Sequence, residues 1–312
     1  MKTTNLNCFL VPQLLMFWVL LGMSEKSSHF SYGDKIETEI CAFEFLTFRP
    51  ELPAKTYLEV FCQIPTNNLK VENYIGSFQL SIVVFNSSGV KVEEETLIDS
   101  VKVQPHDETS INSPPKLIRS AFLIESGEYE ARIRVTDLKS SKFITFTKKL
   151  YVADYSTSAL SLSDLQIATS IMPTREKNIL VKNNRMIVPN IPRIVGLNSN
   201  ELYVYAEIYN LQYSTVKQNE AFIATYIIRN KKGDEVKSER FRYQKPGEAS
   251  FITAGFDVDD LESGQYQLIL KVEDLDSTHK IQKSTHFLVI KSSTDLQLEK
   301  AFSDLSNFHL LR

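Results

Sequence analysis

Glu125-Ser-Gly-Glu-Tyr129, followed by Val135-Thr-Asp137-Leu-Lys-Ser140, returns later in the chain as Glu262-Ser-Gly-Gln-Tyr266 followed by Val272-Glu-Asp274-Leu-Asp-Ser277. Two shorter blocks recur in the same order ahead of it. Tyr57-Leu-Glu59-Val-Phe61 returns as Tyr205-Ala-Glu207-Ile-Tyr209, and Asn86-x-x-Gly89 returns as Asn230-x-x-Gly233. A period this long that occurs only twice indicates two whole domains of one fold, because small solenoid units recur more often and at shorter spacing.

Alternating apolar and polar residues dominate from residue 36 to 290, most clearly over residues 77–85, 129–135 and 265–272. This period of two is typical of half-buried β-strands. Turn-forming stretches separate the runs at short intervals. Short strands divided in this way predict sandwiches of two antiparallel sheets.

The glycine and tyrosine of the longest block add a fold-specific signal. Gly127-x-Tyr129 and Gly264-x-Tyr266 each open a strand after a polar turn, which resembles the tyrosine corner of immunoglobulin-like domains. The residue two places on is Ala131 or Leu268, so the inter-sheet disulfide of antibody domains is absent. The sequence therefore predicts an all-β chain with two tandem immunoglobulin-like or fibronectin-III-like sandwiches.

The predicted domains are a signal peptide over 1–24, a first sandwich over 32–155, a second over 156–291 and a helical tail over 292–312. Residues 156–200 include a proline-containing linker or edge loop. The signal peptide rests on Lys2 ahead of an apolar stretch from Cys8 to Leu21. Export to the periplasm, the cell surface or the medium is expected, with an uncleaved anchor as the alternative. We expect no transmembrane segment after signal cleavage.

Two cysteines, Cys41 and Cys62, are left after removal of the signal peptide. They lie in two expected strands joined by a turn through residues 49–53, so one interpretation is a disulfide between them that closes the hairpin. The alternative is a pair of small buried side chains.

The sequence carries no assembled set of catalytic residues. The five histidines are scattered, and no Walker loop, nucleophile elbow or zinc-protease motif occurs. The net charge of −3 gives no general attraction for phosphate backbones. We therefore expect no enzyme, no cofactor, no metal and no nucleic-acid partner.

Two groups of residues are candidates for ligand binding. The first is a carboxylate cluster that suggests Ca²⁺, against a solvated turn: Asp257, Asp259, Asp260 and Glu262. The second is an aromatic stripe on one face of a strand, which suggests stacking of sugar or peptide, with simple packing as the alternative: Tyr203, Tyr205 and Tyr209. The repeated Glu59 and Glu207 are expected to face solvent.

Three stretches together carry a family resemblance: Leu160-Ser-Leu-Ser-Asp164, residues 187–196 and residues 202–211. They resemble the amino-terminal region of bacterial GWxTD-domain-containing proteins. The resemblance implies an exported protein with immunoglobulin-like sandwiches followed by a helical domain that bears the GWxTD signature. That signature is absent from this sequence, so the resemblance implies compartment and fold and assigns no activity.

The predicted function is that of a non-enzymatic scaffold or protein-interaction module of the bacterial cell envelope, with a protein partner. The oligomeric state is left open. One alternative is a protein that binds carbohydrate, or a ligand through Ca²⁺. Another is an accessory subunit of a separate envelope enzyme.

Overall fold

The computed structural model describes residues 30–33, 41–51, 54–66, 69–103, 115–196, 199–216 and 220–292, with the backbone alone described for 30–33. Within these ranges the chain forms strands and turns and no α-helix, which confirms the all-β prediction. The predicted signal peptide and residues 293–312 of the predicted helical tail lie outside the described residues.

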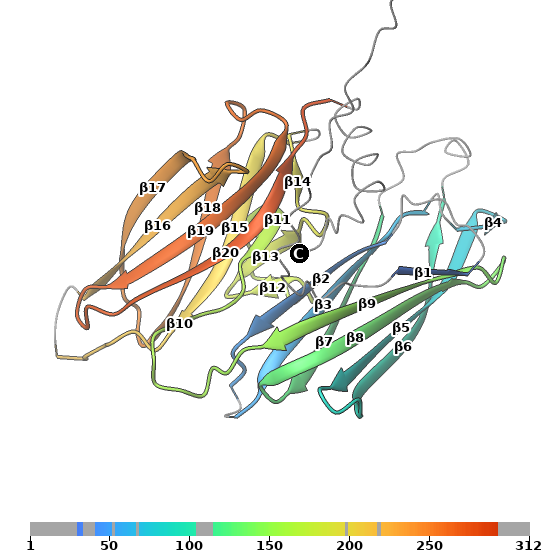
Figure 1. Ribbon diagram of the computed structural model, residues 1–312, viewed down its shortest axis with the longest axis horizontal. Helices are drawn as coiled ribbons and strands as arrows, with labels where there is room; N and C mark the ends of the chain where they lie inside the picture. Colours follow the sequence, from blue (N-terminus) through green and yellow to red (C-terminus); the bar gives the residue numbers. More distant parts are fainter. Residues whose placement is uncertain are drawn as a thin grey trace, which may run out of the picture.

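The first half of the chain forms two sheets (Figure 1). Sheet A has the order β1-β9-β8-β5-β4, with β6 also paired to β5. Sheet B has the order β2-β3-β7. The strands of sheet A are β1 (Phe30–Gly33), β4 (Val71–Glu72), β5 (Ile75–Asn86), β6 (Lys91–Lys102), β8 (Gly127–Asp137) and β9 (Phe143–Val152). Those of sheet B are β2 (Ala42–Phe48), β3 (Thr56–Ile64) and β7 (Lys116–Ile124). Alternate residues of both sheets enclose one core around Leu58, Phe78 and Ile133.

The second half repeats this plan with two further sheets. Sheet C has the order β10-β15-β11-β13-β12, with β18 paired to β15, and sheet D has the order β14-β20-β19-β16-β17. The strands of sheet C are β10 (Ser161–Leu162), β11 (Gln166–Pro173), β12 (Val181–Lys182), β13 (Arg185–Pro189), β15 (Glu201–Tyr209) and β18 (Ala249–Asp257). Those of sheet D are β14 (Ile194–Val195), β16 (Ala221–Asn230), β17 (Glu235–Gln244), β19 (Gly264–Asp274) and β20 (Lys280–Val289). A second core forms between them around Leu202, Phe222 and Leu268.

Both sandwiches contain the hydrogen bond of a tyrosine corner. The hydroxyl of Tyr129 donates to the Glu125 carbonyl at 2.9 Å, and that of Tyr266 donates to the Glu262 carbonyl at 3.0 Å. A tyrosine ring that packs on the core while its hydroxyl holds the preceding turn fixes where the following strand begins. The repeated glycine-tyrosine block therefore sets the same strand start in each half of the chain.

The segment 156–200, predicted to include a proline-containing linker or edge loop, also contains the five strands β10 to β14. Its three prolines are compatible with these strands, since Pro173 and Pro189 end strands and Pro192 lies in the turn before β14. Proline is tolerated at strand ends because its missing N–H is not needed there.

Cys41 and Cys62 are free thiols, so the disulfide suggested by the sequence is absent. The β2–β3 hairpin does form, but its register places Phe43 opposite Cys62 and Ala42 opposite Gln63. Cys62 is fully buried in the first core, and Cys41 packs at its margin. Burial raises the pKa of the Cys41 thiol to about 12, which keeps it protonated.

Candidate functional site

Sheets B and C meet face to face, and we call this contact the junction. Its buried apolar residues come from β2 and β3 on one side and from the β11–β15 region on the other: Leu46, Phe48, Phe61, Ala168, Ile187, Ile191 and Tyr205. The junction is separate from the two sandwich cores, because alternate residues of β3 and β15 point to opposite faces of their sheets. The molecule is thus a stack of four sheets with three apolar layers between them.

The tyrosine stripe of β15 lies in the junction, which corrects its interpretation as a binding face. Tyr205 is fully buried and Tyr209 is 3% exposed. Tyr203 packs at the margin of the junction and is half-buried. The period of two correctly places the three rings on one face, but the first sandwich covers that face.

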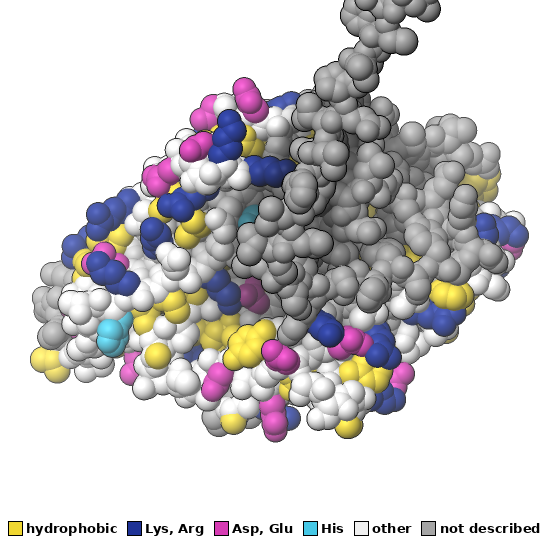
Figure 2. Space-filling view, viewed as in Figure 1, with side chains coloured by type: hydrophobic (Ala, Val, Ile, Leu, Met, Phe, Trp, Pro, Cys, Tyr) yellow, Lys and Arg dark blue, Asp and Glu magenta, His cyan; other side chains and the backbone are white. Residues whose placement is uncertain are grey.

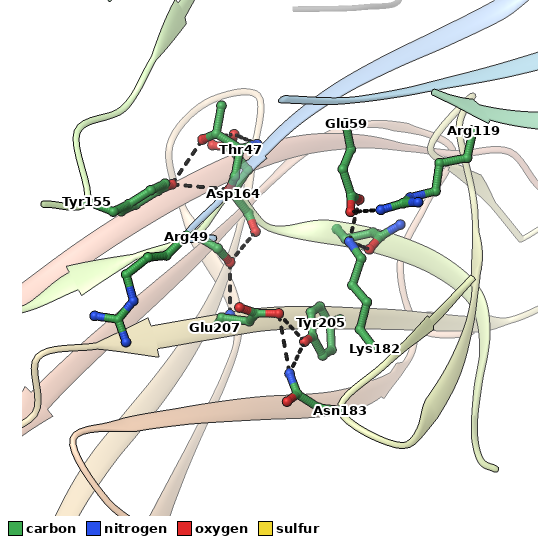
Figure 3. A network of polar contacts seen from close by, with 12 residues as sticks. Thr47, Arg49, Glu59, Arg119, Tyr155, Asp164, Lys182, Asn183, Tyr205 and Glu207 are labelled. Carbon is green, nitrogen blue, oxygen red and sulfur yellow. Dashed lines mark hydrogen bonds and ion pairs between the residues drawn. The ribbon is translucent and has the colours of Figure 1, made fainter. Parts of the chain in front are cut away.

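Glu59 also points into the junction and does not face solvent as the alternation suggested. Its side chain is 5% exposed and makes two ion pairs at 2.5 Å, with Arg119 of β7 and with Lys182 of β12 (Figure 3). The Lys182 ammonium lies 3.5 Å from the centre of the Phe48 ring and donates to Gln166 at 3.1 Å. Burial lowers the pKa of Lys182, and the Glu59 carboxylate opposes that shift.

Glu207, the counterpart of Glu59 in the second repeat, has neutral partners. Its carboxylate accepts hydrogen bonds from the hydroxyls of Tyr205 at 2.5 Å and Tyr209 at 2.7 Å, and Asn183 donates to it at 3.3 Å. Burial is the first cause of the raised pKa of both tyrosines, and the nearby carboxylate is the second. The two repeated glutamates therefore differ in chemistry: Glu59 reaches across the junction to Lys182, whereas Glu207 is bonded by hydroxyl and amide groups of its own sandwich (Figure 3).

A second buried ion pair crosses from sheet B to the second sandwich. Glu44 of β2, whose side chain is fully buried, pairs with Arg193 at 2.9 Å, and Arg193 also donates to Thr285 of β20 at 2.7 Å. One oxygen of Glu44, Oε2, is buried without a hydrogen-bond partner. Burial raises the pKa of Glu44 to about 7 against the opposing effect of Arg193.

The start of the second sandwich is bonded directly to β2. Asp164 accepts hydrogen bonds from the backbone N–H and the hydroxyl of Thr47, at 2.6 and 2.7 Å, and pairs with Lys283 at 2.7 Å. The hydroxyl of Tyr155 lies 2.9 Å from that of Thr47. These bonds fix the segment that links the two sandwiches (Figure 3).

The carboxylate cluster of the second sandwich does not form a calcium site. Lys237 pairs with Asp260 at 3.3 Å, Lys291 lies 3.8 Å from Asp259, and Asp257 accepts from the backbone N–H of Asp259 at 2.8 Å. These four carboxylates, that of Glu262 included, are exposed. Throughout the described ranges, no group of three His, Cys, Asp or Glu side chains is placed to hold a metal ion. The cluster is a solvated turn balanced by lysines.

The described surface also carries charges of both signs. On the face in Figure 2, Lys and Arg side chains are interspersed with Asp and Glu, without a field of one sign over the described atoms. In the described part of the chain, no helix is both long and apolar enough to cross a membrane.

Sequence reasoning missed the cationic half of the junction. Lys182 and Arg193 lie in the segment expected to be a loop, far from Glu59 and Glu44 in the sequence. The available signal was the recurrence of a glutamate inside an apolar strand in both repeats, because a buried charge needs a partner from elsewhere in the chain. Through these ion pairs the junction can hold the two sandwiches in one orientation.

Comparisons with known proteins add little to this description. No family model matches the sequence, and no curated protein matches it. Among solved structures, the chain is similar to trypsin-activated alpha-2-macroglobulin from Escherichia coli, with a TM-score of 0.25, 10% identity and coverage of 80% of this chain and 16% of that one. The native conformation of E. coli alpha-2-macroglobulin gives a TM-score of 0.23, 9% identity and coverage of 84% and 15%. The chain thus spans about one-sixth of the length of these proteins.

Proposed function

We propose that this chain is a non-enzymatic, exported scaffold of the bacterial cell envelope that binds a protein partner. The observation that carries the proposal is the junction, where two buried ion-paired glutamates, Glu59 and Glu44, join the sandwiches. Charged side chains buried in a network of this kind favour one relative orientation of the two sandwiches, because any other orientation would leave charges unpaired in an apolar setting.

A fixed orientation is useful to a protein that presents two surfaces at a set distance. An enzyme would need reactive groups brought together, whereas the charged groups of the junction are occupied by their own ion pairs. Export is supported by the apolar stretch that follows Lys2. The resemblance to GWxTD-domain-containing proteins supports a bacterial envelope location in the same way.

The proposal is tested by breaking the junction and measuring both orientation and partner capture. Lys182→Glu would place a second carboxylate against Glu59, whereas the matched control Lys177→Glu makes the same charge change at an exposed position. We expect ¹⁵N relaxation to give one rotational correlation time for both sandwiches in the wild type and in the control, and two in Lys182→Glu.

Affinity capture from the native envelope fraction with the same three baits tests the scaffold itself. A stoichiometric partner recovered by the wild type and the control but lost by Lys182→Glu supports the proposal. Recovery of the chain alone, or catalytic turnover by the purified chain, would contradict it.

A further inference from the structure

A hollow of about 400 Å³ lies on the outer face of sheet A, where β8 runs between β5 and β9 (Figure 1). This volume falls within the range of small-molecule sites, roughly 300 to 1,000 Å³. Residues of β8 form its floor, and the ends of β5 and β9 form its walls. Six of the lining side chains alternate with core residues and so point to this face: Phe85, Glu128, Glu130, Arg132, Lys149 and Tyr151.

The backbone of the floor is not available to a ligand. Strand β8 is paired with β5 on one side and with β9 on the other. The N–H and C=O groups of such an inner strand bond its two neighbours. A peptide strand therefore cannot be added here, and a ligand in the hollow is recognised by side chains.

The charges that line the hollow balance one another. Glu130 and Arg132 form an ion pair at 2.6 Å, and Glu128 and Lys149 supply one further charge of each sign. The Arg132 guanidinium also lies 4.4 Å from the centre of the Phe85 ring, which helps to hold the pair in place. A ligand with a strong net charge would meet its own sign in half of these groups. The hollow therefore favours a ligand without net charge.

The paired groups keep hydrogen-bonding capacity for a ligand. Arg132 donates through Nε and Nη2 to the same oxygen, Oε1, of Glu130, which leaves Oε2 of Glu130 and Nη1 of Arg132 to bond a ligand. Lys149 lies opposite Glu130 on the neighbouring strand, and residues opposite each other are roughly 5 Å apart. This spacing is comparable to the distance between hydroxyl groups on opposite sides of a sugar ring.

The apolar part of the hollow is small and open. Tyr151 is 67% exposed, so its ring offers a face to a ligand, whereas Arg132 lies over the ring of Phe85. One free ring is too little to shelter an apolar ligand from water. It is enough to stack against the C–H groups of a sugar, while the phenol hydroxyl stays in water.

The fold does not require this set of residues, because the second sandwich lacks it. The strand registers place Gln267 where the first sandwich has Glu130, and Leu288 where it has Tyr151. Leu288 is only 3% exposed. The second sandwich therefore builds the same sheet without the ion pair and without the exposed ring, so these features are available for binding in the first.

We propose that the hollow on sheet A binds a neutral oligosaccharide. One sugar ring stacks on Tyr151, and its hydroxyl groups bond Glu130, Arg132 and Lys149. Hydroxyl groups suit this lining because each can donate to a carboxylate and accept from a cation. The site is additional to the proposed scaffold function, since it lies on the face of sheet A that points away from the junction.

A titration of the full mature chain followed by ¹H–¹⁵N NMR tests the site. The probes are four neutral trisaccharides, namely triacetylchitotriose, cellotriose, maltotriose and mannotriose. We expect saturable shifts at the amides of Glu130, Arg132 and Tyr151 with at least one of them, at millimolar concentrations or below. Absence of saturable shifts with all four, or shifts confined to another part of the chain, would overturn the proposal.

Two charged trisaccharides test the argument from charge. The glucosamine trimer is cationic because it lacks the acetyl groups of triacetylchitotriose, and trigalacturonate is anionic. Each should bind at least tenfold more weakly than the best neutral probe. Equal or tighter binding of either one would mean that the hollow selects by charge, and would overturn the neutral class of ligand.

Three variants complete the titration. Tyr151→Ala removes the exposed ring and should weaken the best neutral probe at least tenfold, whereas Tyr213→Ala removes an exposed tyrosine of the second sandwich and should not. Glu130→Gln leaves the cations in excess, so it should raise the affinity for trigalacturonate severalfold. Undiminished binding by Tyr151→Ala, or no such gain in Glu130→Gln, would contradict the proposal. All three variants leave the junction intact and should keep one correlation time, so failure here is distinct from failure of the scaffold proposal.

Discussion

Replacing Glu59 by glutamine should cost about 3 kcal/mol of stability, because it breaks a buried ionic network without changing its shape. Glutamine keeps the size of the side chain and one acceptor oxygen, so the loss of stability reports mainly the effect of removing the negative charge. Lys182 and Arg119 would then lie in the junction without a carboxylate at 2.5 Å. Breaking one side of a buried pair typically costs 3 to 5 kcal/mol. The side chains of Lys182 and Arg119 are 12% and 23% exposed, so water reaches both and the lower end applies.

The matched control is Glu207→Gln at the equivalent position of the second repeat. Its partners Tyr205 and Tyr209 donate through neutral hydroxyls to its two oxygens. In the glutamine variant one hydroxyl can donate to the amide oxygen, while the other can turn and accept from the amide NH2 group. We expect a cost of about 1 kcal/mol or less. The comparison holds the repeat position and the chemical change constant, while the charge of the partners differs and Glu207 is less buried than Glu59.

Urea unfolding followed by circular dichroism measures both costs. Tryptophan fluorescence is unsuitable because the one tryptophan, Trp18, lies in the predicted signal peptide. Adding Lys182→Met to Glu59→Gln should recover part of the loss, since the double variant no longer buries an unpaired ammonium. Equal costs for Glu59→Gln and Glu207→Gln, or no recovery in the double variant, would refute the electrostatic account of the junction.

Three further predictions concern single residues. Tyr266→Phe should lower stability by about 1 kcal/mol through loss of the corner hydrogen bond, and an unchanged urea midpoint would argue that the hydroxyl bonds water equally well. Glu44 has a pKa raised by burial to about 7, so the folded state holds its proton more tightly than the unfolded state. The stability that Glu44 contributes through this shift is therefore fully present below pH 4.5 and is lost as pH rises to about 7. The difference in unfolding free energy between wild type and Glu44→Gln, measured from pH 4.5 to 8, should change across that window, and a constant difference would contradict the shift. Lys245→Met should cost about 3 kcal/mol, because it leaves the fully buried Asp274 without its ammonium partner; a calorimetric Tm within a degree of wild type would rule this out.

The repeats predicted the two-sandwich plan because their residues act locally. The tyrosine corner at Tyr129 and Tyr266 depends on a carbonyl four residues earlier, and the turns at Asn86 and Asn230 depend on side chains that bond their own loops. Such contacts are encoded in a few consecutive residues and can be recognised in each copy.

The junction could not be predicted in the same way. Alternation assigned Tyr205 and Glu207 to one face of β15, but it carries no information on what covers that face. Glu59 and Lys182 are 123 residues apart in the sequence, and only the packing of sheet B on sheet C brings them together. Of the two alternatives for Cys41 and Cys62, the disulfide is absent for a related reason, because the register of the β2–β3 hairpin fixes which residues lie opposite Cys62.

Glu59 and Glu207 occupy one repeat position and both point into the contact between the sandwiches, so each module uses the same face to meet the other. Two identical subunits that met in this way would have to place the same residues on both sides of a symmetric interface. Joining the two copies in one polypeptide removes that constraint, because each copy of the face can change independently. Here Glu59 pairs with a cation of the other sandwich, whereas Glu207 is bonded by hydroxyls of its own strand, so the two halves of the contact are unlike.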